Sequence, residues 1–175
     1  QSGNFDAAKF VNTLWTDRVL PFTDDTAIEA SLLLNSLATQ TITDTGKQYG
    51  RQAGEGSPWS FLTKGSGEVI SVDRSSRQGY AVITIDDGKT LELLLGPVLF
   101  STSIRDALNF ISFNDFANQI VFADVGNELT AMGLNNNQIA LSQLRVGSIV
   151  EFTGAFSLYS ANDTIRLSPI QIRVK

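Results

Sequence analysis

The order of the strand-like segments constrains this fold more than any other feature of the chain. From Glu68 the apolar residues recur at every second position, as in a strand with one buried face. Three such segments follow one another in "EVISVD", "YAVITID" and "KTLELLLG". The same period returns much later in "IVEFTGAFSLY" and "TIRLSPIQIRV". The stretch between the two groups has helical character, so the pattern is three strands, a helical insertion and two strands.

That order is typical of the five-stranded OB barrel, which places its helix between strands three and four. Asp86–Gly88 predicts a tight hairpin between the second and third strands, because an Asp-Gly pair accepts positive φ. Gly154 indicates a bulge, which would also make Pro169 acceptable in the last strand. We therefore expect an α+β protein with an OB-like five-stranded antiparallel β-barrel over residues 68–175 and a long insertion over 101–145. A two-sheet α+β sandwich is the alternative.

Two helices are expected before the barrel, in a segment spanning residues 1–40 that packs on the body. The first shows helical spacing over Phe5–Val19 and should end at Pro21, since the residue before proline avoids the helical region. The second is "TAIEASLLLNSLATQ", capped by Asp24 or Asp25. The whole chain is expected to form a single structural domain.

Residues 41–67 change in character and are rich in glycine. Such a composition predicts an extended connector rather than a helix. Trp59 and Phe61 within it indicate that the connector packs against the body instead of hanging free.

The stretch "FISFNDFANQIVFADV" leaves two interpretations open. Its phenylalanines fit one face of a helix that starts at Asn114 and stops at Gly133, with Asp124 and Asn127 partly buried. The same aromatic and polar residues would also suit a sugar-binding surface.

Composition excludes several classes of function. The net charge is −5, the sequence pI is about 4.6 and no cluster of Lys or Arg occurs, so we expect no nucleic-acid partner. The chain has no cysteine and no histidine, which removes thiol nucleophiles, imidazole bases and the usual zinc ligands. We therefore expect no metal, no cofactor and no enzymatic activity. No apolar run is long enough to span a membrane, and the chain as given is expected to be soluble.

Six residues are candidates for binding a ligand or a partner. A glycine-rich segment around an arginine and a tryptophan could cradle an anion or stack a sugar, and a second arginine could fork to a carboxylate or to sugar hydroxyls. The alternative is structural: a strap across the barrel and an internal clamp between helix and barrel. The candidates are Arg51, Trp59, Arg105, Asp106, Asn118 and Gln119.

Three stretches of the sequence are distinctive: "GPVLFSTSIRDALNFISFNDFANQIVFADVGNEL", "KQYGRQAGEGSPWSFLTKGSGEVISVDRSSRQG" and "VGSIVEFTGAF". In combination they resemble an uncharacterised bacterial family of predicted periplasmic lipoproteins, and the resemblance covers most of the chain. It implies a cleaved signal peptide, a periplasmic location and a lipid-bearing cysteine upstream of Gln1. The genes of such proteins tend to lie beside sugar-uptake ABC transporters, and the family offers no catalytic residues to carry over.

Three functions follow as expectations. The first is a non-enzymatic, membrane-tethered accessory of a sugar ABC transporter, with a transporter component as its partner. The second is a module that binds a carbohydrate or another small molecule. The third and weakest is a small glycosidase, which would need two carboxylates facing each other across a cleft.

Overall fold

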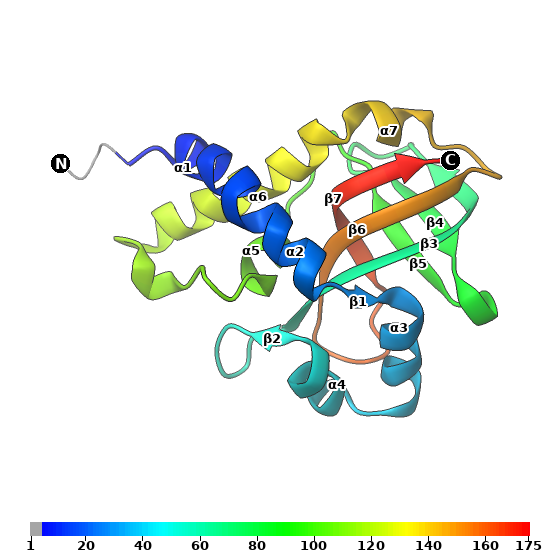
Figure 1. Cartoon of the computed structure of the whole chain (residues 1–175), viewed down its shortest axis with the longest axis horizontal. Coiled ribbons are helices and arrows are strands. Elements are labelled where there is room, and N and C mark those ends of the chain that lie inside the picture. Colours follow the sequence, from blue (N-terminus) through cyan, green and yellow to red (C-terminus); the bar gives the residue numbers. More distant parts are fainter. Residues whose placement is uncertain (1–4) are drawn as a thin grey trace.

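Five strands close into a ring in the computed structural model, which describes residues 5–175 apart from the side chain of residue 87 (Figure 1). In chain order they are β3 (Trp59–Asp73), β4 (Tyr80–Thr84), β5 (Thr90–Leu94), β6 (Ile149–Leu158) and β7 (Arg166–Val174). Around the ring the order is β3-β4-β5-β7-β6, and β6 pairs again with β3. This OB-like order is the one the sequence predicted, and a single closed ring forms in place of the alternative sandwich.

One detail of the predicted ring is wrong, because its strands are not all antiparallel. Strands β5 and β7 run parallel, while the other four neighbouring pairs are antiparallel. A closed ring with an odd number of strands cannot alternate direction all the way round. At least one parallel pair is therefore unavoidable in five strands.

The longest strand, β3, changes partner along one of its edges. That edge pairs first with β2 (Arg51–Gln52), then in parallel with β1 (Ile28–Glu29), and finally with β4. Its other edge pairs with β6 throughout Trp59–Glu68. Gly67 lies at the handover to β4, where an added Cβ would overlap the carbonyl oxygen of Thr84. The glycine therefore lets the strand approach β4 closely.

The predicted turn and bulge are both present. The 3-10 turn η3 (Asp86–Gly88) joins β4 to β5, with Ile85 N–H donating to the Lys89 carbonyl oxygen at 2.8 Å and Gly88 at φ +74°. Between β6 and β7 the register shifts at Gly154, which pairs with Pro169. The proline is thus accommodated at an irregularity, as expected.

The first helix does not stop at Pro21, contrary to the prediction. It runs as α1 (Ala7–Leu14), a π-helical turn η2 (Trp15–Val19) and α2 (Leu20–Thr26). In the widened turn, Leu20 N–H donates to the Trp15 carbonyl oxygen, five residues back. Proline then falls in the first turn of α2, a position that tolerates its missing N–H.

The second helix and the connector also differ from the predictions. The second helix is α3 (Ala30–Thr39), which starts after β1 instead of at Asp24 or Asp25. The segment 41–67 contains α4 (Ile42–Tyr49), β2 and the first half of β3. The side chain of Thr41 accepts from Asp44 N–H at 3.1 Å and so caps α4.

The glycines of this segment serve packing. A Cβ on Gly46 would overlap the Trp59 ring, and one on Gly50 would crowd Phe61. Phe61 itself is buried and stacks on Phe156, with ring centroids 5.1 Å apart. The predicted anchoring of the segment through Trp59 and Phe61 is confirmed.

The helical insertion lies between β5 and β6, as the sequence predicted for 101–145. It consists of α5 (Ser103–Ala107), a 3-10 turn η4 (Phe113–Asp115), α6 (Gln119–Asn136) and α7 (Gln138–Gln143). The long helix begins five residues after the predicted Asn114 and passes through Gly133. Ser112 and Asp115 close a capping box around η4, so the chain turns before α6 can start.

The insertion is fastened to the open edge of β7. Asn137 donates to the carbonyl oxygens of Gly133 and Ile170, and its own side-chain oxygen accepts from Ile172 N–H at 2.9 Å. Gly133 lies directly against the Pro169 carbonyl group, where no Cβ would fit. A buried side-chain amide thus occupies hydrogen-bonding positions on β7 that a neighbouring strand would otherwise fill.

Two hydrophobic cores result. One fills the ring and the end covered by α3, and includes Phe61, Phe156 and Leu93. The other lies outside the ring, where α1, η2, α5 and α6 cover residues such as Leu62, Ala155 and Ile170. The N-terminal helices and the insertion therefore share one core on the outer face of the sheet.

Candidate functional site

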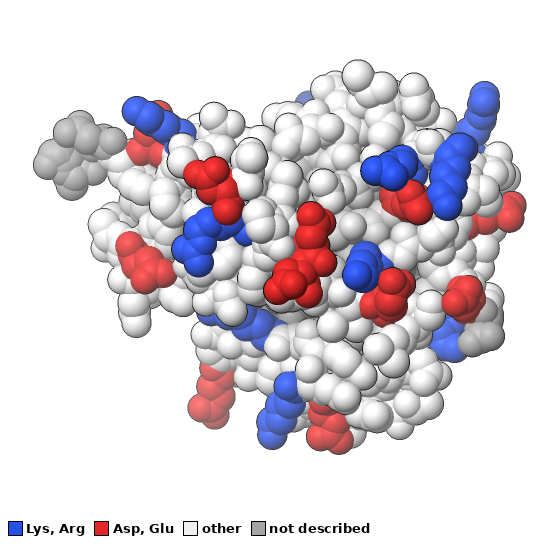
Figure 2. Space-filling model, in the orientation of Figure 1, with Lys and Arg blue, Asp and Glu red and all other residues white. Residues whose placement is uncertain are grey.

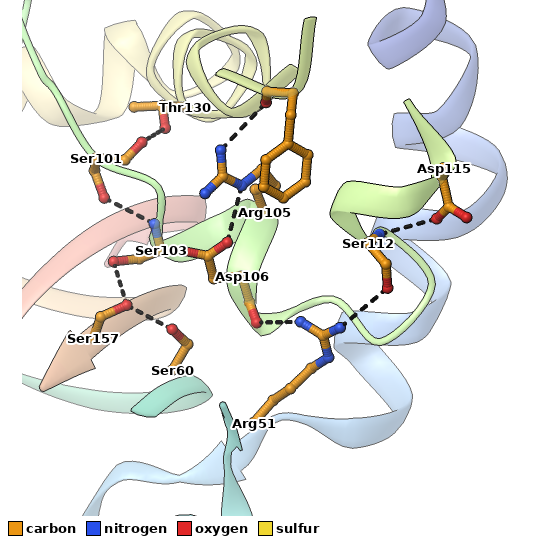
Figure 3. Close-up of polar contacts among 11 residues, drawn as sticks. Arg51, Ser60, Ser101, Ser103, Arg105, Asp106, Ser112, Asp115, Thr130 and Ser157 are labelled. Carbon is orange, nitrogen blue, oxygen red and sulfur yellow. Dashed lines mark hydrogen bonds and ion pairs between the residues drawn. The ribbon is translucent and has the colours of Figure 1, made fainter. Parts of the chain in front are cut away.

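Three of the six candidate residues meet where α5 contacts β2. Arg51 comes from β2, and its guanidinium donates from Nη1 to the Asp106 carbonyl oxygen at 3.0 Å and from Nη2 to Ser112 Oγ at 3.4 Å (Figure 3). Both acceptors belong to the insertion. The arginine therefore ties the segment before β3 to the loop that leads into η4.

Arg105 is engaged in the same way on the other side of α5. Its Nε donates to Asp106 Oδ1 at 2.9 Å, and Nη1 donates to the Phe122 carbonyl oxygen at 3.2 Å. The guanidinium carbon lies 3.7 Å from the centroid of the Phe122 ring. The side chains of Arg105 and Asp106 are each only 12% exposed. Arg105 thus forms an internal clamp, but the clamp joins α5 to α6 within the insertion and not a helix to the barrel, as the structural alternative had it.

A chain of hydroxyl groups continues from the clamp toward the ring (Figure 3). Ser157 Oγ on β6 lies 2.7 Å from Ser60 Oγ and 3.0 Å from Ser103 Oγ. Ser101 accepts two further hydrogen bonds, at Oγ from the Ser103 N–H and at its carbonyl oxygen from the Thr130 hydroxyl. Each hydroxyl has a partner within the protein, so the chain is a satisfied internal network. Sequence reasoning missed it because the serines come from segments far apart, and only the register of β3 against β6 brings two of them face to face.

The other three candidates lie elsewhere. Asn118 is the N-cap of α6, and its side chain accepts from Val121 N–H at 3.0 Å. Gln119 is exposed at the start of the same helix, and Trp59 packs over Gly46. The six residues therefore do not form one ligand site, because helix capping, packing and the clamp account for five of them.

The expected burial of Asp124 and Asn127 is also wrong. Both are exposed on α6, and the buried side of that helix carries Val125 and Leu129. The helical wheel failed because residues 113–118 belong to the separate turn η4 and the loop after it, so the wheel counted phenylalanines that α6 does not contain.

The described chain offers a different candidate, an open groove of about 550 Å³ on the outer face of the sheet. We call it the sheet groove. Charged and polar side chains from three neighbouring strands and from β1 line it, with Phe152 beneath them: Glu29, Lys64, Ser66, Glu151, Thr153, Gln171 and Arg173.

Charges of both signs border the sheet groove. Glu151 pairs with Arg173 at 3.7 Å and with Lys175 at 3.3 Å, both through largely exposed side chains. Such pairs contribute little to stability and exchange easily for other partners. Figure 2 shows acidic and basic side chains interspersed over this side of the molecule, with no large patch of one sign. The surface suits a ligand or partner with mixed polarity better than a polyanion.

The sequence did contain a signal for the sheet groove. Lys64 and Ser66, Glu151 and Thr153, and Gln171 and Arg173 are polar residues two apart on their strands. An alternation of this kind marks the face that points away from the core. What the sequence could not show is that these three polar rows lie side by side.

Three further properties of the described residues bear on function: metal ligation, membrane spanning and shifted pKa values. No three His, Cys, Asp or Glu side chains within residues 5–175 are grouped closely enough to hold a metal ion. Nor does that part of the chain contain a helix with the length and apolar character needed to cross a membrane. The hydroxyl and backbone N–H of Ser75 lower the pKa of Asp73, the last residue of β3.

Comparisons with known proteins agree on fold and family. The family model described as "Predicted periplasmic lipoprotein (DUF2291)" matches residues 1–173. The crystal structure of an OB-fold protein from Thermotoga maritima superposes with a TM-score of 0.81 at 18% identity, covering 98% of this chain and 99% of that one. This likeness shows the OB-like fold.

Two further solved structures are much less similar. An OBody bound to hen egg-white lysozyme gives a TM-score of 0.38 at 9% identity, covering 65% of this chain and 80% of that one. The Stn1–Ten1 complex of S. pombe gives 0.37 at 10% identity, with coverage of 65% and 57%. No curated protein matches the sequence.

Proposed function

Because the chain belongs to the DUF2291 family of predicted periplasmic lipoproteins, we propose that it is a non-enzymatic, membrane-tethered accessory of a sugar-uptake ABC transporter. The sheet groove is the surface through which it docks. Support for the transporter comes from the family resemblance, and support for docking comes from the exposed charges of the groove. The single observation that carries the proposal is this open, polar groove on a rigid sheet, while the more enclosed polar clusters are engaged internally.

The charges of the groove favour a protein partner. Glu151, Arg173 and Lys175 form long, exposed ion pairs, so a partner with complementary charges can replace them without uncovering a buried charge. Lys64 and Glu29 lie in register on β3 and β1, at the edge of the same groove. Their positions are fixed by backbone pairing, which limits the ordering that binding requires.

The test is capture of the transporter from membranes of cells that express it. The native chain should recover a transporter subunit or its substrate-binding protein. Lys64→Glu together with Arg173→Glu should abolish that recovery. Lys47→Glu with Arg145→Glu changes the net charge equally at two exposed positions outside the sheet groove and should leave recovery intact. Failure of the native chain to recover either component would contradict the accessory function.

The sheet groove also supports the second expectation, a carbohydrate-binding module. Amide, hydroxyl, carboxylate and cationic groups stand side by side there, and together they can donate to and accept from sugar hydroxyls. This site differs from the one expected around Arg51 and Arg105. A sugar that binds only the folded protein must raise its melting temperature, and Gln171→Ala should reduce that rise. A flat melting temperature across monosaccharides and oligosaccharides would exclude this function.

A further inference from the structure

One end of the molecule carries a connected group of phenylalanine rings. Ring centroids lie 5.6 Å apart for Phe5 and Phe10, 5.8 Å for Phe10 and Phe116, 5.8 Å for Phe116 and Phe122, and 5.6 Å for Phe113 and Phe122. We call this group, together with the exposed isoleucine in the first turn of α6, the phenylalanine face: Phe5, Phe10, Phe113, Phe116, Ile120 and Phe122.

The phenylalanine face is incompletely covered. Phe5 is 43% exposed, Phe113 is 45% exposed and Ile120 is 74% exposed, and the other three side chains are only partly buried. Two of the four ring contacts are edge-to-face and two are tilted, at centroid distances typical of aromatic pairs. Here they build a connected apolar surface, and an exposed apolar surface of this kind marks a contact with a partner or a membrane.

Its place in the fold points to the lipid surface. Helix α1, the turn η4 and the first turn of α6 lie together at the end of the long axis nearest the N-terminus, and the ring lies toward the other end (Figure 1). A lipoprotein carries its acyl chains at the N-terminus, and this chain enters the described fold at Phe5. The described fold therefore begins at the phenylalanine face.

The charges around the phenylalanine face are compatible with contact with a lipid bilayer. A hollow along α1 is bordered by Phe5, Phe10 and Leu14, with Asp6 and Lys9 of opposite sign beside them. Aromatic side chains settle at the boundary between headgroups and acyl chains. The charges along this hollow balance, and η4 adds the carboxylate of Asp115, so attraction to the bilayer would come from apolar contact and would not depend on anionic lipid.

We propose that the phenylalanine face rests on the lipid bilayer and sets the orientation of the tethered protein. This inference depends on the lipoprotein assignment and not on the transporter partner or the sheet groove. Helix α6 runs from the face toward the ring and contains 18 residues. At a rise of about 1.5 Å per residue, the helix spans roughly 27 Å. It thereby holds the ring above the membrane surface.

The chain lacks cysteine, so one added before Gln1 would be unique and could be coupled to a maleimide lipid in vesicles of phosphatidylethanolamine and phosphatidylglycerol. Two tryptophan probes are then compared, Ile120→Trp and Ile139→Trp. The parent residues are 74% and 76% exposed; one lies in the first turn of α6 and the other in α7, beyond its far end. Substitution at such exposed positions leaves both cores intact, and melting curves check this.

Brominated lipids should quench the probe at position 120 strongly and the probe at position 139 weakly, after subtraction of the signal of Trp15 and Trp59. In the uncoupled protein, Phe5→Ser with Phe113→Ser should lower partitioning into the same vesicles roughly tenfold. Equal quenching of both probes, or none, would overturn the proposal. So would a dimer in light scattering that already shields the probe at position 120 without lipid. Because the vesicles contain no transporter, failure here is distinguishable from failure of the accessory function.

Discussion

The two lines along which the ring closes are built very differently. Between β3 and β6 the strands pair residue by residue from Trp59 to Glu68. Between β5 and β7 only two residue pairs form, Glu92 with Arg166 and Leu93 with Leu167. Beyond these two pairs, the edge of β7 that faces away from β6 is covered by α6 and by the side chain of Asn137. We call these two lines the strand seam and the helix seam.

The difference shows what the long insertion contributes to this fold. In the strand seam, stability is spread over many backbone hydrogen bonds, so no single side chain is decisive. In the helix seam, stability is concentrated at two residues, Gly133 and Asn137. We therefore expect substitutions in the helix seam to be far more damaging than substitutions in the strand seam.

The largest effect is expected for Gly133→Ala. The new Cβ would overlap the Pro169 carbonyl oxygen, so α6 would have to move away from β7, at a cost of about 3 kcal/mol. Chemical denaturation followed by tryptophan fluorescence measures this. Gly126→Ala in the same helix is the control, because its nearest neighbour is a side-chain atom, Arg105 Nη1 at 3.2 Å, which needs to shift by only a few tenths of an ångström. Equal losses for the two variants would contradict the close approach at Gly133.

Asn137→Ala should follow, with a loss of about 2 kcal/mol of unfolding free energy, the cost of leaving buried polar groups without a partner. The groups concerned are the Ile170 carbonyl oxygen and the Ile172 N–H. Hydrogen exchange at Ile172 should become faster. Asn136→Ala, at an exposed neighbouring position, should leave both stability and exchange almost unchanged. Unchanged exchange at Ile172 in the Asn137 variant would argue against its role at the helix seam.

Ser60→Ala tests the strand seam and should cost less, about 1 kcal/mol. The variant loses the hydroxyl contact with Ser157 but keeps the backbone pairing on both sides. Ser66→Ala, exposed on the same strand, is the control and should be close to neutral. If Ser60→Ala proved as damaging as Asn137→Ala, the contrast between the two seams would fail.

The smallest effect is expected in the turn after β3, outside both seams. The Ser75 hydroxyl and backbone N–H favour the ionised form of Asp73 and lower its pKa from the ordinary value of 3.8. The contribution to stability is therefore complete above the unfolded pKa and is lost as the pH falls through the lower folded pKa. An NMR titration should show the Asp73 pKa rising in Ser75→Ala. A pKa that does not move would assign the shift to another group.

The sequence predicted the fold where local signals and tertiary structure agree. The period of two located the end of β3 and the other four strands of the ring, Asp-Gly located the hairpin, and Gly154 located the bulge. Prediction failed where tertiary contact overrides composition. Gly46 and Gly50 looked like linker residues, yet they make room for Trp59 and Phe61 beside a helix and a strand.

The site was harder to predict than the fold. Arg51, Arg105 and Asp106 were predicted to bind a ligand or a partner, whereas in the structure their hydrogen bonds join groups within the chain. Asn118 proved to be the N-cap of α6. It takes that place because η4 is a separate turn, so that α6 starts only after it. The polar alternation that forms the sheet groove is present in the sequence on three strands. Their adjacency depends on ring closure between residues far apart in the chain.

That closure has a consequence for how the chain folds. Ser60 and Ser157, which meet across β3 and β6, are 97 residues apart in the sequence. Pairing at such a distance must overcome a large loop-closure entropy before any contact is formed, whereas α1 and α6 contain mostly local contacts. The helices can thus form early, while the ring closes slowly and only after nearly the whole chain is available. Until then the inner faces of β3 and β4 stay uncovered, and the unfinished molecule is most prone to aggregate during that interval.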